Sequence, residues 1–141
     1  MFELTERALV GAPPMTVWND FTDADSLARW FWPPRVEPRV VVEPVELGRW
    51  EVESPVAGIA VQGRIVALEA ARSLRLRWQW AGEAAATDVE IKLEATADAS
   101  TRVIVHQSGF GTAEELQSHI EGWADACSGW SRGTRDHRVR L

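Results

Sequence analysis

Apolar and polar residues alternate along most of the chain with the period of two that is typical of β-strands. The clearest example is the segment 87–95, where Val89, Ile91 and Leu93 alternate with charged residues. Further segments with this alternation are also predicted strands: 2–10, 35–43, 49–53, 59–68, 74–80 and 101–110. Short turns separate all of these strands after the first. The later strands are therefore expected to pair as an antiparallel meander with one apolar face.

The spacing of apolar residues changes to the helical period of 3.6 in the last part of the chain. The apolar side chains on one face of this predicted helix are Leu116, Ile120, Trp123, Cys127 and Trp130. Thr112 and Glu115 form a capping box that predicts where the helix begins, and Gly133 predicts where it ends. A helix of about 20 residues is roughly 30 Å long, which is enough to cross a small domain.

Two short helices are predicted between the first and second strands. Pro14 fits the opening of the first helix, over 15–21, because proline is favoured in the first turn. Thr22 with Asp25 resembles a capping pair for the second helix, over 23–31. The predicted order is therefore one strand, two short helices, six strands and one long helix.

We expect one domain over 1–141, because the sequence contains no linker, repeat or low-complexity segment. The long helix is the only predicted element large enough to cover the apolar face of the sheet. An α+β fold with the sheet wrapped around this helix is therefore expected. The basic residues of 132–141 are expected to form a frayed tail.

The charge balance and the single cysteine narrow the classes of function. The net charge of −6, from 15 basic and 21 acidic residues, argues against a nucleic-acid partner. No apolar run approaches the roughly 18 residues of a membrane span, and the N-terminal residues lack the pattern of a signal peptide. Cys127 has no second cysteine to pair with, which fits a reducing compartment. We therefore expect a cytoplasmic protein with no membrane partner.

Residues with catalytic or metal-binding chemistry are few. Cys127 and His119 lie about 12 Å apart along the predicted helix axis, too far for a thiolate–imidazole pair. His106 is either an outward residue or a satisfied core histidine, and no His or Cys accompanies it at metal-ligand spacing. Asp23 and Asp25 are better explained as capping residues at a helix start. No glycine-rich phosphate loop is present, so neither a metal nor a cofactor is expected.

Eight tryptophans and no tyrosine are the unusual feature of the composition. Each indole can bury on the order of 200 Å², so these rings either pack the core or line a cavity. Trp78 and Trp80 share one face of their predicted strand. Gln107 is expected to face inward together with Val103 and Val105, and an inward glutamine needs a partner or a ligand.

Short motifs follow one another along almost the whole chain: Ala12-Pro13-Pro14 with Val17-Trp18, Thr22-Asp23, Leu27-Ala28-Arg29-Trp30-Phe31, Gly48-Arg49-Trp50, Gly63, Leu74-Arg75-Leu76-Arg77-Trp78, Thr101-Arg102-Val103, Ser108-Gly109-Phe110 and Gly122-Trp123. Together they resemble the Bet v 1-like superfamily, also called START-like or SRPBCC. The most similar branch is the one related to the C-terminal domain of the Hsp90 ATPase activator. The resemblance implies a helix-grip fold, in which a curved seven-stranded antiparallel sheet grips the C-terminal helix.

The sequence departs from the family pattern at two places that bear on the groove. Leu47-Gly48 stands where the family often has two glycines, so that turn is expected to differ. Gln107 stands where a histidine is common, so no role of that histidine is carried over.

Many members of this superfamily hold an apolar ligand between the sheet and the helix. The resemblance and the aromatic pattern together imply a ligand-binding set on both sides of the groove: Trp18, Trp30, Phe31, Trp78, Trp80, Val105, Gln107, Leu116, Ile120, Trp123 and Cys127. Gln107 is its main polar member. Arg64 and an inward Glu51 or Glu53 are weaker polar candidates.

Three functions are compatible with these observations. The favoured one is non-catalytic binding of a small apolar or aromatic molecule. The second is a chaperone interaction module, by analogy with the Hsp90 activator. The third is an enzyme of the polyketide cyclase or aromatase kind, which some family members are and which needs polar groups inside the cavity. An exposed Trp32 or Trp50 would equally mark a homodimer face.

Overall fold

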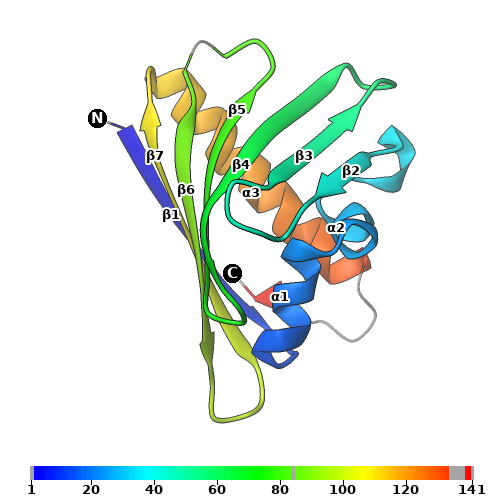
Figure 1. Cartoon of the computed structure of the whole chain (residues 1–141), viewed down its shortest axis with the longest axis vertical. Coiled ribbons are helices and arrows are strands. Elements are labelled where there is room, and N and C mark those ends of the chain that lie inside the picture. The colour runs from blue at the N-terminus through cyan, green and yellow to red at the C-terminus, as the bar shows by residue number, and fades with distance from the viewer. Residues whose placement is uncertain (1, 84, 134–138, 141) are drawn as a thin grey trace.

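A curved antiparallel sheet wraps around one long helix, as Figure 1 shows. This computed structural model describes the backbone of residues 2–83, 85–133 and 139–140. It describes the side chains of the same residues except 34, 125–133 and 139–140. The expected α+β helix-grip architecture is confirmed.

The sheet is a meander closed by the first strand of the chain. Its strands are β1 (Phe2–Val10), β2 (Arg39–Val42), β3 (Arg49–Ser54), β4 (Ile59–Glu69), β5 (Ser73–Trp80), β6 (Thr87–Ala95), β7 (Thr101–Phe110) and β8 (Val139–Arg140). The order across the sheet is β2-β3-β4-β5-β6-β7-β1-β8. The meander from β2 to β7 is therefore as predicted, and β1 joins it by pairing antiparallel with β7.

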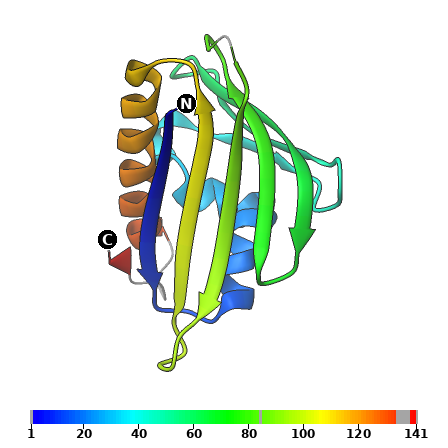
Figure 2. The ribbon, with the colours of Figure 1, turned by 90° about the vertical axis from the view of Figure 1, so that its left-hand side faces the viewer.

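The helices α1 (Pro14–Thr22), α2 (Ala24–Trp30) and α3 (Ala113–Gly133) lie on the concave side of the sheet. Figure 2 shows α3 running along the strands beside β1 and β7, with α1 and α2 behind the same sheet. Within the described residues, none of the helices combines the length and apolar character that crossing a membrane requires.

The predicted second strand, 35–43, begins too early. The structure has a single 3-10 turn over Pro34–Val36, and β2 begins only at Arg39. Pro38 has no backbone N–H to donate to a neighbouring strand, so regular pairing starts directly after it.

The predicted cap of the second helix is also corrected. Asp23 is the N-cap residue of α2, and its carboxylate accepts a hydrogen bond from the Ser26 amide at 3.0 Å. The Thr22 hydroxyl instead donates to the backbone oxygen of Trp18 at 2.8 Å, inside α1. The carboxylate is the stronger acceptor for the amides at a helix start.

The C-terminal tail is described only in part. Val139 and Arg140 form β8 and pair with Val10 and Leu9 of β1. Residues 134–138 and 141, on which most of the expected frayed tail falls, lie outside the described residues.

One glycine is required by close packing in the middle of the sheet. A Cβ atom on Gly63 of β4 would lie 3.0 Å from the backbone oxygen of Trp50 and 3.2 Å from Cβ of Trp78. The backbone approach at this position is therefore too close for a larger residue without a shift of its neighbours. It allows two neighbouring tryptophans to project together into the concave side.

Candidate functional site

Aromatic rings from both walls of the groove meet between the sheet and α3. The ring centre of Phe31, directly after α2, lies 5.4 Å from Trp50, 6.3 Å from Trp78 and 6.2 Å from Trp123. The indoles of Trp78 on β5 and Trp123 on α3 stack at 5.5 Å with their planes 13° apart. Sheet, α2 and α3 are thus joined by ring contacts, which add roughly 0.5–1.5 kcal/mol each beyond their buried area.

A second group of rings surrounds Trp80 at the end of β5. Its half-buried indole lies 5.7 Å from Trp32 and 5.5 Å, edge to face, from the imidazole of His119. Phe110, at the end of β7, packs 4.8 Å from the same imidazole. These rings lie at the end of the space between the sheet and α3 where the β5–β6 loop meets the first turns of α3, and this end is here called the mouth of the groove.

The buried indole N–H groups differ in their hydrogen bonding. Trp30 donates to the backbone oxygen of Asp20 at 2.8 Å, and Trp50 donates to that of Phe21 at 2.9 Å. The Nε1 atoms of Trp78 and Trp80 are buried as well, but no described atom accepts a hydrogen bond from either. A buried donor without an acceptor costs about 1–3 kcal/mol, so two on one strand are unusual.

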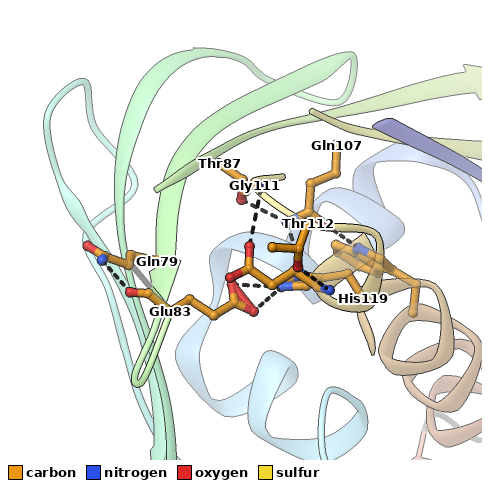
Figure 3. Close-up of polar contacts among 9 residues, drawn as sticks. Gln79, Glu83, Thr87, Gln107, Gly111, Thr112 and His119 are labelled. Carbon is orange, nitrogen blue, oxygen red and sulfur yellow. Dashed lines mark hydrogen bonds and ion pairs between the residues drawn. The ribbon is translucent and has the colours of Figure 1, made fainter. Parts of the chain in front are cut away.

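Gln107 is fully buried on β7 and is the centre of a polar network (Figure 3). Its Nε2 donates to Thr87 Oγ1 at 2.8 Å and lies 3.2 Å from His119 Nδ1. Its Oε1 accepts from the indole of Trp123 at 2.9 Å. His119 Nε2 lies 2.7 Å from a carboxylate oxygen of Glu83 on the β5–β6 loop. The network therefore connects β6, β7, α3 and this loop.

The direction of each hydrogen bond follows from the indole. An indole nitrogen only donates, so the Gln107 oxygen must face Trp123 and the amide nitrogen must face His119. His119 Nδ1 is then the acceptor, and the ring proton is on Nε2, where it is donated to Glu83. Both amide hydrogens and the oxygen of Gln107 are used within the protein.

Local hydrogen bonds fix the start of α3, the helix that carries His119, and the β5–β6 loop, which carries Glu83. The predicted capping box of α3 is confirmed: Thr112 Oγ1 accepts from the Glu115 amide at 3.1 Å. The Glu115 carboxylate accepts from the Gly111 amide at 3.2 Å, so the helix start is held from both sides. On the outer face of β5, Gln79 Nε2 donates to the backbone oxygen of Glu83 at 2.8 Å (Figure 3).

The rings leave little open volume beside Trp123. A cavity of about 10 Å³ lies there, lined by Trp30, Val105 and Trp123 together with residues of β1. This volume is at the lower limit for a single water molecule. At this end of the groove, the predicted lining residues therefore pack against one another.

The structure brings most of the predicted ligand-binding residues together. The buried ones are Trp18, Trp30, Phe31, Trp78, Val105, Gln107 and Trp123. Trp80, Leu116 and Ile120 are half-buried and pack against the same core. The side chain of Cys127 lies outside the described residues.

Several weaker expectations are corrected. Trp32 and Trp50 are buried and so do not offer an exposed dimer face. Arg64 is exposed on the outer face of β4, where it donates to the backbone oxygen of Leu47 at 3.3 Å. Glu51 forms an ion pair with a partly exposed Arg49 at 2.9 Å rather than facing the groove. Alternation along each strand turns these charged side chains away from the groove.

His119 is the site residue that sequence reasoning missed. Its separation from Cys127 excludes a thiolate–imidazole pair, but His119 lies three residues after Leu116 and four before Trp123, on the same helical face. This spacing is the signal that could have found it. His106, by contrast, faces outward on β7, where its Nδ1 lies 3.1 Å from Thr5 Oγ1.

Shifted pKa values mark structural contacts outside the groove. The hydrogen bond from the Ser26 amide lowers the pKa of the Asp23 carboxyl. The hydrogen bond from the Arg49 guanidinium lowers the pKa of the Glu51 carboxyl. No group of three or more potential metal ligands occurs among the described residues.

Known proteins with the same fold include an Hsp90 activator. The Plasmodium falciparum Hsp90 activator shares 14% identity with this chain and superposes with a TM-score of 0.82. The match covers 99% of this chain and 100% of the activator chain. A Mesorhizobium loti protein shares 17% identity over 93% of this chain and 95% of its own, with a TM-score of 0.80. DynU16, from the dynemicin biosynthetic locus, shares 22% identity over 92% of this chain but only 46% of its own, with a TM-score of 0.78.

No curated protein matches the chain in sequence. The model of one protein family, described as "Activator of Hsp90 ATPase homolog 1-like protein", matches residues 11–129. This match covers most of the chain and agrees with the motifs, the strand order and the fold. The chain therefore belongs to the family of proteins like the activator of Hsp90 ATPase homolog 1.

Proposed function

We propose that this protein binds a small apolar or aromatic molecule between the sheet and α3, without transforming it. The observation that carries the proposal is the aromatic layer between the two walls, in which the buried N–H groups of Trp78 and Trp80 meet no described acceptor. Binding pockets are mostly apolar and contain a few placed polar groups. A layer of indoles with two donors that no described atom accepts from has this composition.

The polar network supports binding over catalysis. A cyclase-like enzyme needs a group inside the groove that can give or take a proton at the substrate. Gln107 uses both amide hydrogens and its oxygen within the protein, and both nitrogens of His119 are occupied. The network is therefore organised to hold Trp123 and α3 in place.

Among the described residues, rings from the two walls of the groove touch. The volume beside Trp123 is only about 10 Å³, so an occupant that lies between Trp78 and Trp123 shifts their stack or the side chains at the mouth. Trp80, Leu116 and Ile120 are half-buried there, so their side chains are less enclosed than those of the fully buried residues. We therefore expect binding to depend on movement of α3 relative to β5.

Titration monitored by tryptophan fluorescence tests the proposal. Fatty acids, flavonoids and polyketide-like aromatics are added separately, and the shift or quenching of emission is recorded together with the thermal midpoint. The variant Trp80→Ala should alter the affinity for any molecule that binds. Arg77→Ala, on the outer face of the same strand, is the matched control and should not. Absence of any spectral or thermal response with all three classes would exclude the proposal.

A chaperone partner is the second candidate, and family membership is the observation that favours it. The family match covers residues 11–129, and the described fold superposes on an Hsp90 activator over nearly the whole chain. The test is the ATPase rate of purified Hsp90 with and without a molar excess of this protein. An unchanged rate, together with no complex in gel filtration, would exclude this candidate.

A further inference from the structure

We propose that Trp78 and Trp80 recognise the occupant of the groove, and that this occupant is a neutral, planar aromatic molecule carrying a carbonyl oxygen. The inference rests on the proposed function and specifies its ligand. It starts from the two indole N–H groups on β5 that are buried and have no acceptor among the described residues.

Three other buried indoles in this core each have an acceptor for their N–H group. Trp30, Trp50 and Trp123 each donate to an oxygen at 2.8–2.9 Å, two of them to backbone oxygens and one to a side chain. Protein folds rarely leave a buried N–H unpaired. An indole can only donate, so the missing partner on a ligand must be an acceptor atom.

The geometry of β5 places the two donors along one occupant. Trp78 and Trp80 lie two residues apart on the concave side of the strand, which corresponds to roughly 7 Å along it. Trp78 lies deep, stacked on Trp123, whereas Trp80 is half-buried at the mouth between Trp32 and His119. A flat molecule that enters at Trp80 and slides toward Trp78 would meet indole surfaces along its whole path.

The negative charge of the Glu83 carboxylate at the mouth disfavours a ligand that carries an anionic group. Glu83 lies next to Trp80, because its amide donates to the Trp80 backbone oxygen at 3.1 Å. Its carboxylate, which receives the His119 hydrogen bond, lies at the same end of the groove. A ligand carboxylate would approach this negative charge in a poorly solvated place, which is unfavourable. A ketone or quinone oxygen supplies an acceptor without that repulsion.

A matched pair of probes tests this assignment. 9-Fluorenone and fluorene have the same planar ring system, but only fluorenone carries a carbonyl acceptor. We expect the wild-type protein to bind fluorenone roughly tenfold more tightly than fluorene, because one added hydrogen bond to a buried donor contributes about that factor. The ratio of the two affinities is the readout, so the fraction of active protein cancels.

Two variants remove the donors and one serves as the control. Trp78→Phe and Trp80→Phe keep an aromatic ring but lose the N–H. One carbonyl oxygen can bond only one of two donors about 7 Å apart, so the fluorenone preference should fall toward unity in one of these two variants and persist in the other. Trp32→Phe changes a ring beside Trp80 without removing either proposed donor, and it should keep the preference. A preference that persists equally in all three variants would overturn the assignment.

A measurement on the wild-type protein covers the case in which a variant does not fold. In ¹H–¹⁵N spectra the indole N–H signal of the residue that bonds the carbonyl, Trp78 or Trp80, should move downfield with fluorenone but not with fluorene. Equal affinities and equal spectral changes for the two probes would overturn this inference and leave the proposed function standing. Failure of both probes to bind would count against the inference and against the proposed function together.

Discussion

The substitution Gln107→Met gives the sharpest test of the buried network. Methionine keeps the length and volume of the side chain but removes both the donors and the acceptor. Trp123 Nε1 then loses its acceptor and His119 Nδ1 loses its donor, and both residues are at least 95% buried. The Thr87 hydroxyl also loses a partner, but it can rotate.

The magnitude follows from the atoms left unpaired. Each buried polar atom without a partner costs about 1–3 kcal/mol, so the two rigid ones together predict a loss of about 2–6 kcal/mol. Total stabilities of domains are only about 5–15 kcal/mol, so this loss is a large share. With a urea dependence of about 2 kcal/mol per M, the unfolding midpoint should fall by roughly 1–3 M.

Urea unfolding followed by far-UV circular dichroism measures the effect. Arg102→Met is the matched control, because Arg102 faces outward on the same strand and its ion pair with Glu94 is exposed. We expect the control to change stability by less than about 0.5 kcal/mol. A midpoint for Gln107→Met close to that of the control would refute the reasoning.

A double-mutant cycle separates the Gln107–Trp123 bond from general loss of packing. Trp123→Phe removes the indole donor that Gln107→Met leaves unpaired. The double variant should therefore be less destabilised than the sum of the single variants, by about 1–2 kcal/mol. Simple additivity would show that this hydrogen bond contributes little.

Three further predictions concern single positions. Trp123→Ala should cost about 3–5 kcal/mol and open a cavity on the order of 150 Å³, so benzene should raise the thermal midpoint of the variant but not of the wild type. Gly63→Ala should cost about 1–3 kcal/mol in urea unfolding, since its Cβ would press on the Trp50 backbone and on Trp78; an unchanged midpoint would contradict the packing described. Asp23→Ala should cost about 1 kcal/mol at neutral pH, because the N-cap of α2 is lost. The pKa of Asp23 is lowered from its ordinary value of 3.8, so this contribution is present above that pH and disappears as the pH falls through the folded-state pKa. A difference between wild type and Asp23→Ala that stays constant down to pH 2 would contradict it.

Local pattern alone determined the elements and the facing of most side chains. Alternation with a period of two identified the strands from β1 to β7, with only the start of β2 displaced. The helical stripe and the capping box identified α3. The inward position of Gln107 followed from the same alternation, because a strand turns successive side chains to opposite faces. These properties depend on neighbours a few residues away.

Tertiary structure alone decided what each inward side chain meets. Gln107 is paired with His119, twelve residues later, and His119 with Glu83, thirty-six residues earlier, across elements that only folding brings together. How α2, α3 and the sheet pack also decides the burial of Trp32 and Trp50, and why no described atom accepts from Trp78 and Trp80. The sequence pattern determines which face a residue occupies, because that is a property of the local backbone. Which atom lies 3 Å away is a property of the packed whole, so the hydrogen-bond partners within the candidate site emerged only from the structure.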